Sequence, residues 1–110
     1  MKPRIMYIEM KSHDGGHDDR GPAWIGRVTF SKTGKTIYYR DLKLERANCG
    51  CGNHVDTESG DVYWVSGPKK DGTDRYYWGK SAPVEIDEDV REEYWTQIRN
   101  QPNKISEKFA

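Results

Sequence analysis

The sequence predicts a mainly β fold of the α+β class: a small twisted antiparallel sheet, or an SH3-like barrel, of about five strands with one C-terminal helix packed on it. Three observations favour this class. Short β-forming stretches are separated by glycine-rich and aspartate-rich turns, residues 25–39 carry a strong hairpin signal, and one late stretch has a helical apolar period. We expect a single β-rich domain over residues 1–101 and a loose C-terminal tail over residues 102–110.

The first strand is predicted at residues 4–11, where Met6, Ile8 and Met10 alternate with Tyr7 and two charged residues. The even positions should therefore face the core, and Tyr7 on the other face should be partly covered. Glycine, aspartate, serine and proline dominate residues 12–22, which predicts an exposed loop.

The hairpin is predicted from two β-forming stretches, residues 24–31 and 36–46, that flank a turn at residues 32–34. Gly34 should adopt the positive φ that a type I turn with a G1 bulge requires. The register that this turn implies pairs Ser31 with Lys35, Val28 with Tyr38, Gly26 with Arg40, and Trp24 with Leu42.

The middle of the chain predicts shorter elements. Residues 48–61 resemble a second loop, residues 62–66 a fourth strand and residues 75–78 a fifth, with a turn at residues 67–74 between those two strands. A short edge strand is expected at residues 81–86, because Pro83 cannot donate to a central ladder.

The helix is predicted from residue 87 or 88 to about residue 100, since Val90, Tyr94 and Ile98 recur at every fourth position. Acidic residues in its first turn suit the positive end of the helix dipole. The predicted core residues are Met6, Ile8, Trp24, Val28, Phe30, Tyr38, Leu42, Trp64, Val90, Tyr94 and Ile98.

Composition limits the possible functions. The 18 basic and 18 acidic residues balance, whereas a dedicated nucleic-acid-binding protein is more often basic. Four Trp, seven Tyr and two Phe supply a thin aromatic core. The N-terminus lacks the apolar region of a signal peptide, and no stretch has the length of a membrane span. We therefore expect a cytoplasmic protein with reduced thiols and no membrane partner.

One candidate site is a zinc site formed by Cys49, Cys51 and His54, with His13 and His17 in the other loop as further ligands. Thiolates and imidazoles are the ligands that zinc prefers. The alternative is a flexible loop with free thiols and solvated histidines, because the single residue between the cysteines is a tighter spacing than ordinary zinc sites use.

A second candidate is a ligand face for single-stranded nucleic acid that includes Lys69, Lys70, Arg75 and Tyr77. Basic residues beside aromatic rings suit phosphate contact combined with base stacking. The alternative is that the rings fill the core and the charges solvate a turn.

Three runs of the sequence, residues 21–39, 61–72 and 84–95, resemble a family of small uncharacterised bacterial proteins of about the same length. Some members carry the misassigned name 1-deoxy-D-xylulose-5-phosphate synthase, an activity that needs a far longer chain. The resemblance implies a bacterial, cytosolic, single-domain protein and provides no catalytic or binding residue.

The sequence thus favours a small non-enzymatic binding module, with another protein as the expected partner. Zinc binding and single-stranded nucleic-acid binding are the alternatives. We identify no catalytic residue and expect no cofactor, apart from the zinc of the first alternative, because no set of acid and base groups can be placed together from the sequence.

Overall fold

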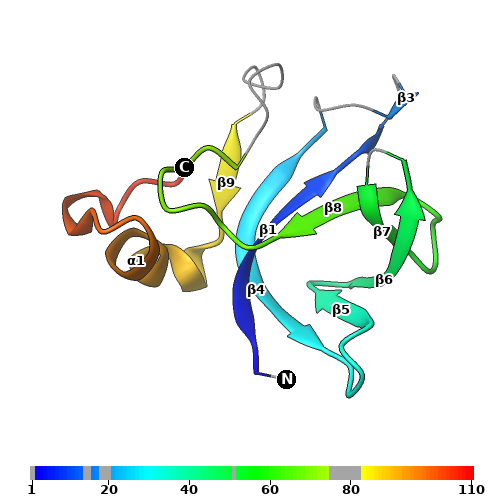
Figure 1. The fold of residues 1–110 in the computed structure, drawn as a ribbon. Coiled ribbons are helices and arrows are strands. Elements are labelled where there is room, and N and C mark those ends of the chain that lie inside the picture. The colour runs from blue at the N-terminus through cyan, green and yellow to red at the C-terminus, as the bar shows by residue number, and fades with distance from the viewer. Residues whose placement is uncertain (1, 14–15, 18–20, 51, 75–82) are drawn as a thin grey trace.

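The computed structural model describes residues 2–13, 16–17, 21–50, 52–74 and 83–110, and it confirms the predicted fold class (Figure 1). Within these residues, six strands close into an antiparallel barrel in the order β1-β8-β7-β6-β5-β4, and β4 pairs with β1 to complete the ring. The barrel strands are β1 (Arg4–Met10), β4 (Ala23–Phe30), β5 (Thr36–Tyr39), β6 (Leu42–Cys49), β7 (Gly52–Asp56) and β8 (Val62–Ser66). Two short strands, β2 (Ser12–His13) and β3 (Gly16–His17), form a separate hairpin.

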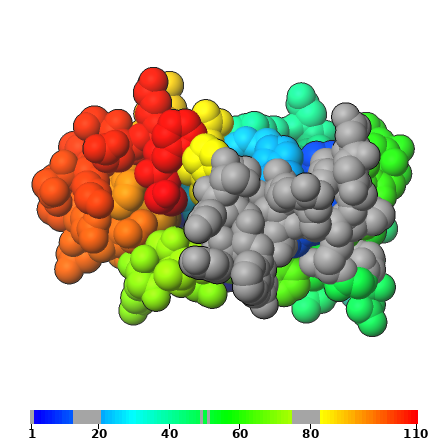
Figure 2. Space-filling view, turned by 90° about the horizontal axis from the view of Figure 1, so that it is seen from above, coloured from blue at the N-terminus to red at the C-terminus, as the bar shows by residue number. Residues whose placement is uncertain are grey.

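A seventh strand of the main sheet, β9 (Val84–Ile86), pairs in parallel with the start of β4. The predicted helix follows it as a continuous helical segment over residues 88–98. This segment begins with a 3₁₀ turn (Glu88–Val90), continues through α1 (Arg91–Glu93) and ends with a π-helical turn (Tyr94–Ile98). The helical segment and the chain after it form one end of the molecule, and the barrel forms the other (Figure 2).

The apolar core consists of two clusters that share the β1–β4 pair. Even-numbered residues of β1, such as Ile8, face the barrel interior, and odd-numbered ones, such as Ile5 and Tyr7, face the helical segment. The barrel cluster contains Met6, Ile8, Val28, Ile37, Tyr39, Leu44, Tyr63 and Val65. The helix cluster contains Ile5, Tyr7, Ala23, Ile25, Val84, Ile86, Val90, Tyr94 and Trp95.

The predicted hairpin register is wrong by one residue. Thr29 pairs with Tyr38, and the Ser31 amide donates to the Thr36 carbonyl at 3.0 Å, so the loop holds four residues instead of three. Gly34 does adopt the predicted positive φ, at 76°. Because a one-residue shift reverses every side chain, Tyr38 is 40% exposed and Ile37 takes the buried position.

The predicted third strand is in fact two strands, because the chain reverses at Arg40 and Asp41, and Leu42 pairs with Tyr39 instead of Trp24. The loop expected at residues 48–61 likewise contains β7. Trp64, predicted in the core, is 39% exposed on the outer face of β8. Four other predicted core residues are only partly buried at the edges of the clusters: Trp24, Phe30, Leu42 and Ile98. The strand predicted at residues 75–78 lies outside the described residues.

A polar clamp joins the barrel to the start of the helical segment. The Arg40 guanidinium lies 2.5 Å from Asp87 Oδ1, and the Tyr39 hydroxyl donates to Asp87 Oδ2 at 2.6 Å. The Arg40 guanidinium also lies 5.1 Å from the ring centroids of both Trp24 and Tyr39. Burial, together with the Asp87 hydrogen bond, raises the pKa of Tyr39, so the phenol stays protonated and continues to donate.

Gly26 makes room for this clamp. A Cβ at that position would lie 2.4 Å from both Tyr39 Cε1 and Asp87 Oδ2. We predict that Gly26→Ala lowers the free energy of unfolding by about 1–3 kcal/mol, because the ring or the carboxylate must move. Urea denaturation measures the change.

The matched control is Gly67→Ala, where the nearest atom to the added methyl group is the Arg4 guanidinium at 3.7 Å. That change should stay within about 0.5 kcal/mol of the wild type. Equal effects of the two substitutions would contradict the role given to Gly26.

Candidate functional site

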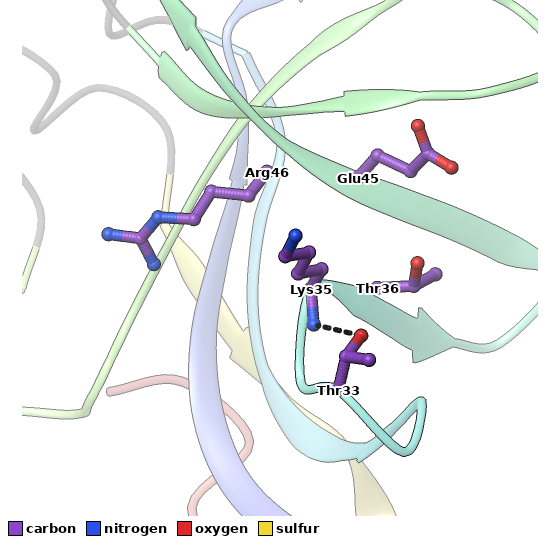
Figure 3. A pocket seen from close by; sticks show the side chains of 5 residues that line it. All are labelled: Thr33, Lys35, Thr36, Glu45 and Arg46. Carbon is purple, nitrogen blue, oxygen red and sulfur yellow. Dashed lines mark hydrogen bonds between the residues drawn. The ribbon is translucent and has the colours of Figure 1, made fainter.

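An open hollow lies where the tip of the β4–β5 hairpin meets β6. Its lining residues are Thr33, Lys35, Thr36, Glu45 and Arg46 (Figure 3). Two features fix this arrangement: Thr36 and Glu45 are cross-strand partners, and the Arg46 amide donates to the Lys35 carbonyl at 3.1 Å. In Figure 3 the side chain of Lys35 lies between those of Glu45 and Arg46, which extend in opposite directions from β6.

The strand register places Tyr38 beside this hollow. Thr36 and Tyr38 share the outer face of β5, and their partners on β6 are Glu45 and Lys43. Residues 32–46 carry five basic side chains against two acidic ones, although the whole chain is neutral. We call this region the hairpin surface, defined by Thr33, Lys35, Thr36, Tyr38, Lys43, Glu45 and Arg46.

The chemistry of the hairpin surface suits contact with an anionic group. Two threonine hydroxyl groups and three cationic groups offer hydrogen bonds and charge to an anion, and the exposed Tyr38 side chain offers a flat ring and a third hydroxyl group. The seven residues that define the surface include one carboxylate and neither a histidine nor a cysteine.

Two of the predicted zinc ligands, Cys49 and His54, lie in the paired strands β6 and β7, whereas His13 and His17 lie in β2 and β3. Cys49 ends β6, where its Cα pairs with Gly52, and His54 lies in β7. Cys51 falls outside the described residues, so the full set of three ligands stays a prediction. No group of three or more His, Cys, Asp or Glu side chains within the described part of the chain is arranged to hold a metal ion.

His54 is buried in the barrel, and its Nδ1 lies 2.8 Å from the Asn53 side-chain oxygen. Burial lowers the pKa of His54, and the nearby Arg46 charge lowers it further. The folded chain therefore favours the neutral form of the His54 ring. The start of the loop predicted at residues 12–22 lies beside the start of β8, where the Val62 amide donates to Ser12 Oγ at 2.8 Å.

The predicted nucleic-acid face is described only in part. Lys69 and Lys70 are exposed in the turn over residues 67–74, and the Lys69 amide donates to Asp74 Oδ1 at 2.6 Å. Arg75 and Tyr77 lie outside the described residues. The turn contacts the end of the helical segment, since a Cβ on Gly72 would lie 2.4 Å from an Arg99 nitrogen.

Sequence reasoning missed a buried polar chain on the outer face of β1. The Tyr7 hydroxyl donates to Glu9 Oε1 at 2.5 Å, and Lys11 Nζ lies 2.9 Å from Glu9 Oε2 as an ion pair. Glu9 is 2% exposed and Lys11 is 5% exposed. The partial cover expected for Tyr7 was the available signal, because Glu9 and Lys11 alternate onto the same face of the strand.

The comparisons with known proteins return no matching family model, no matching curated protein and no matching solved structure. No helix among the described residues is long and apolar enough to cross a membrane.

The buried ion pair generates a stability prediction. Lys11→Met should lower the free energy of unfolding by about 3–5 kcal/mol, because it leaves the buried Glu9 carboxyl group without the ammonium group that it pairs with. The double variant Glu9→Gln/Lys11→Met carries no charge and still gives Tyr7 an acceptor, so it should recover most of the loss. Urea denaturation of both variants tests this, and a double variant no more stable than Lys11→Met would refute it.

The lowered pKa of His54 generates a pH prediction. Below the ordinary histidine pKa of about 6.5, His54 binds a proton more readily in the unfolded chain than in the folded chain. The free energy of unfolding should therefore fall as the pH drops from about 7.5 to about 5.5. His54→Gln should flatten this dependence, because it removes the imidazole whose protonation is opposed by burial and by the Arg46 charge. The measurement is the urea midpoint across this range, and an unchanged slope in the variant would count against the assignment.

Proposed function

We propose that the chain is a small, non-enzymatic, cytoplasmic binding module that recognises an acidic segment of another protein through its hairpin surface. The observation that carries this proposal is the exposed Tyr38 ring, which has Lys43 directly across the strand pair and the hollow with Lys35 and Arg46 beside it. Exposed aromatic residues and arginines are enriched at the contacts that dominate protein interfaces.

Charge supports an acidic partner. Lys35 and Lys43 outnumber the single carboxylate of the hairpin surface, and Arg46, which extends from β6 away from Glu45, adds positive charge on the other side of the hollow. A partner with the opposite sign therefore gains both affinity and association rate. Arg40 lies in the same segment but is already paired with Asp87 and is therefore not counted among the groups that meet the partner.

Single-stranded nucleic acid is the second candidate, because the same surface offers an aromatic ring beside cations. A neutral chain favours it less, since such proteins usually present a larger excess of basic residues. The two candidates differ in the ligand and share the surface.

The experiment selects peptides that bind the wild-type protein from a displayed random library and then titrates synthetic copies of the enriched peptides. The expected peptides are acidic. Tyr38→Ala should weaken them by about tenfold, and Lys35→Glu should weaken them at least as much because it reverses a charge. Trp64→Ala is the matched control, since it removes an equally exposed ring from another face.

The same variants are titrated with a labelled oligothymidine of about 15 nucleotides at low and moderate salt. Tyr38-dependent binding of the oligonucleotide with no acidic peptide enriched would replace the protein partner with nucleic acid. Peptide binding that neither Tyr38→Ala nor Lys35→Glu weakens would refute the hairpin surface as the site.

A further inference from the structure

β9 lies at the end of the sheet order, outside the closed barrel. One edge of β9 pairs with β4, where Ala23 lies opposite Val84 and Ile25 lies opposite Ile86. The other edge is not covered by any strand of the barrel. An open edge presents backbone donors and acceptors in line, and it accepts another extended segment.

The chain fills this edge with its own C-terminal residues, as the position of the C-terminus beside β9 shows (Figure 1). The Ile86 amide donates to the Lys108 carbonyl at 2.7 Å, and the Ala110 amide donates to the Val84 carbonyl at 3.0 Å. Glu85 and Phe109 lie directly opposite each other in an antiparallel bridge. Residues 108–110 thus pair with β9 through one antiparallel bridge, in the segment expected to be a loose tail.

This added strand buries little surface. Every residue from 102 to 110 is exposed, and Phe109 is 49% exposed although it sits in the bridge. Besides the two strand hydrogen bonds, Trp95 Nε1 donates to the Glu107 carbonyl at 3.0 Å. Each such bond contributes only about 1 kcal/mol net, so the segment is held by a few replaceable contacts.

We propose that β9 is a homotypic strand-exchange site, at which residues 108–110 of a second copy replace the chain's own. In the structure this segment is hydrogen-bonded to β9. The same segment of a second copy has the same donor and acceptor groups, so it can form the same hydrogen bonds. Reciprocal exchange closes into a two-fold dimer in which no bond of the contact is lost. This inference does not depend on the hairpin surface, because it uses a different part of the molecule.

The segment that links helix and tail provides the hinge. Asn100 has a φ of 53°, and Pro102 begins a short 3₁₀ turn that ends at Lys104. A change of backbone direction at Asn100 would redirect the tail and break the hydrogen bond from the buried Trp95 to the Glu107 carbonyl. In a reciprocal exchange, the tail of the second copy restores that bond. The tethered segment has an effective concentration of roughly millimolar order, so exchange should grow as the protein concentration approaches that value.

The test uses chains in which Cys49 and Cys51 are replaced by serine. One chain carries Glu85→Cys and the other carries Phe109→Cys, and the two are refolded together over a range of concentrations and then oxidised. Glu85 and Phe109 form a non-hydrogen-bonded antiparallel pair. The Cα atoms of such a pair lie about 4.5 Å apart, a separation that a disulfide spans. We expect a covalent heterodimer on a non-reducing gel, with a yield that rises with concentration.

Two controls make the result specific. Pairing Glu85→Cys with Ile105→Cys places the second thiol on the tail but away from the bridge, and it should give several-fold less heterodimer. Adding Ala110→Pro to the Phe109→Cys chain removes the amide that donates to Val84, and it should lower the yield as well. A single chain with both Glu85→Cys and Phe109→Cys should form the internal disulfide at low concentration.

Failure of the internal disulfide to form would show that the tail does not occupy β9 and would overturn the inference. A heterodimer yield no higher than that of the Ile105→Cys control at every concentration would overturn it as well. Neither outcome bears on peptide recognition by the hairpin surface, which is measured with chains that keep their native tail.

Discussion

The fold depends on burying both faces of the β1–β4 pair. The barrel cluster lies on one face and the helix cluster on the other, so this two-stranded unit belongs to both. One third of the residues are charged, so the chain has few apolar side chains to bury. Because both clusters use the β1–β4 pair, each of them buries more apolar surface than it would with separate strands. The helical segment is accordingly needed for the core, since it covers Ile5, Tyr7 and Ile25, which would otherwise lie on the outside of the barrel.

The same double burial explains which parts of the fold could be predicted. Val90 and Tyr94 repeat with a helical period, and a local pattern of that kind is visible in the sequence. The positive φ of Gly34 is also a local property of the turn. Strand register is set by the turn length and by distant partners together. The local pattern therefore predicts a hairpin register that is wrong by one residue and a buried position for Tyr38, which is exposed.

The candidate site was harder to predict than the fold. The hairpin surface exists because β5 and β6 reverse at Arg40, which brings Lys43 opposite Tyr38. A single long strand over that stretch, as the β propensity suggested, would have separated these residues. Arg40 adopts a positive φ of 53°, which is uncommon for a residue other than glycine, and its contacts with Asp87 and the Trp24 ring help to hold this turn. No residue pattern near position 40 indicates a turn held by a partner 47 residues away.

β4 connects the two surfaces discussed above. Its first residues pair with β9 and its last residues lead into the hairpin, and eight residues of extended strand span roughly 25 Å. A ligand on the hairpin surface would therefore not block strand exchange at the β9 edge. A dimer formed by exchange at β9 would carry two hairpin surfaces on one particle, so a partner with repeated acidic segments would bind it more tightly than it binds a single chain, without any new contact. The strand-exchange contact and the hairpin surface would then act together, with the first setting the number of binding surfaces and the second their chemistry.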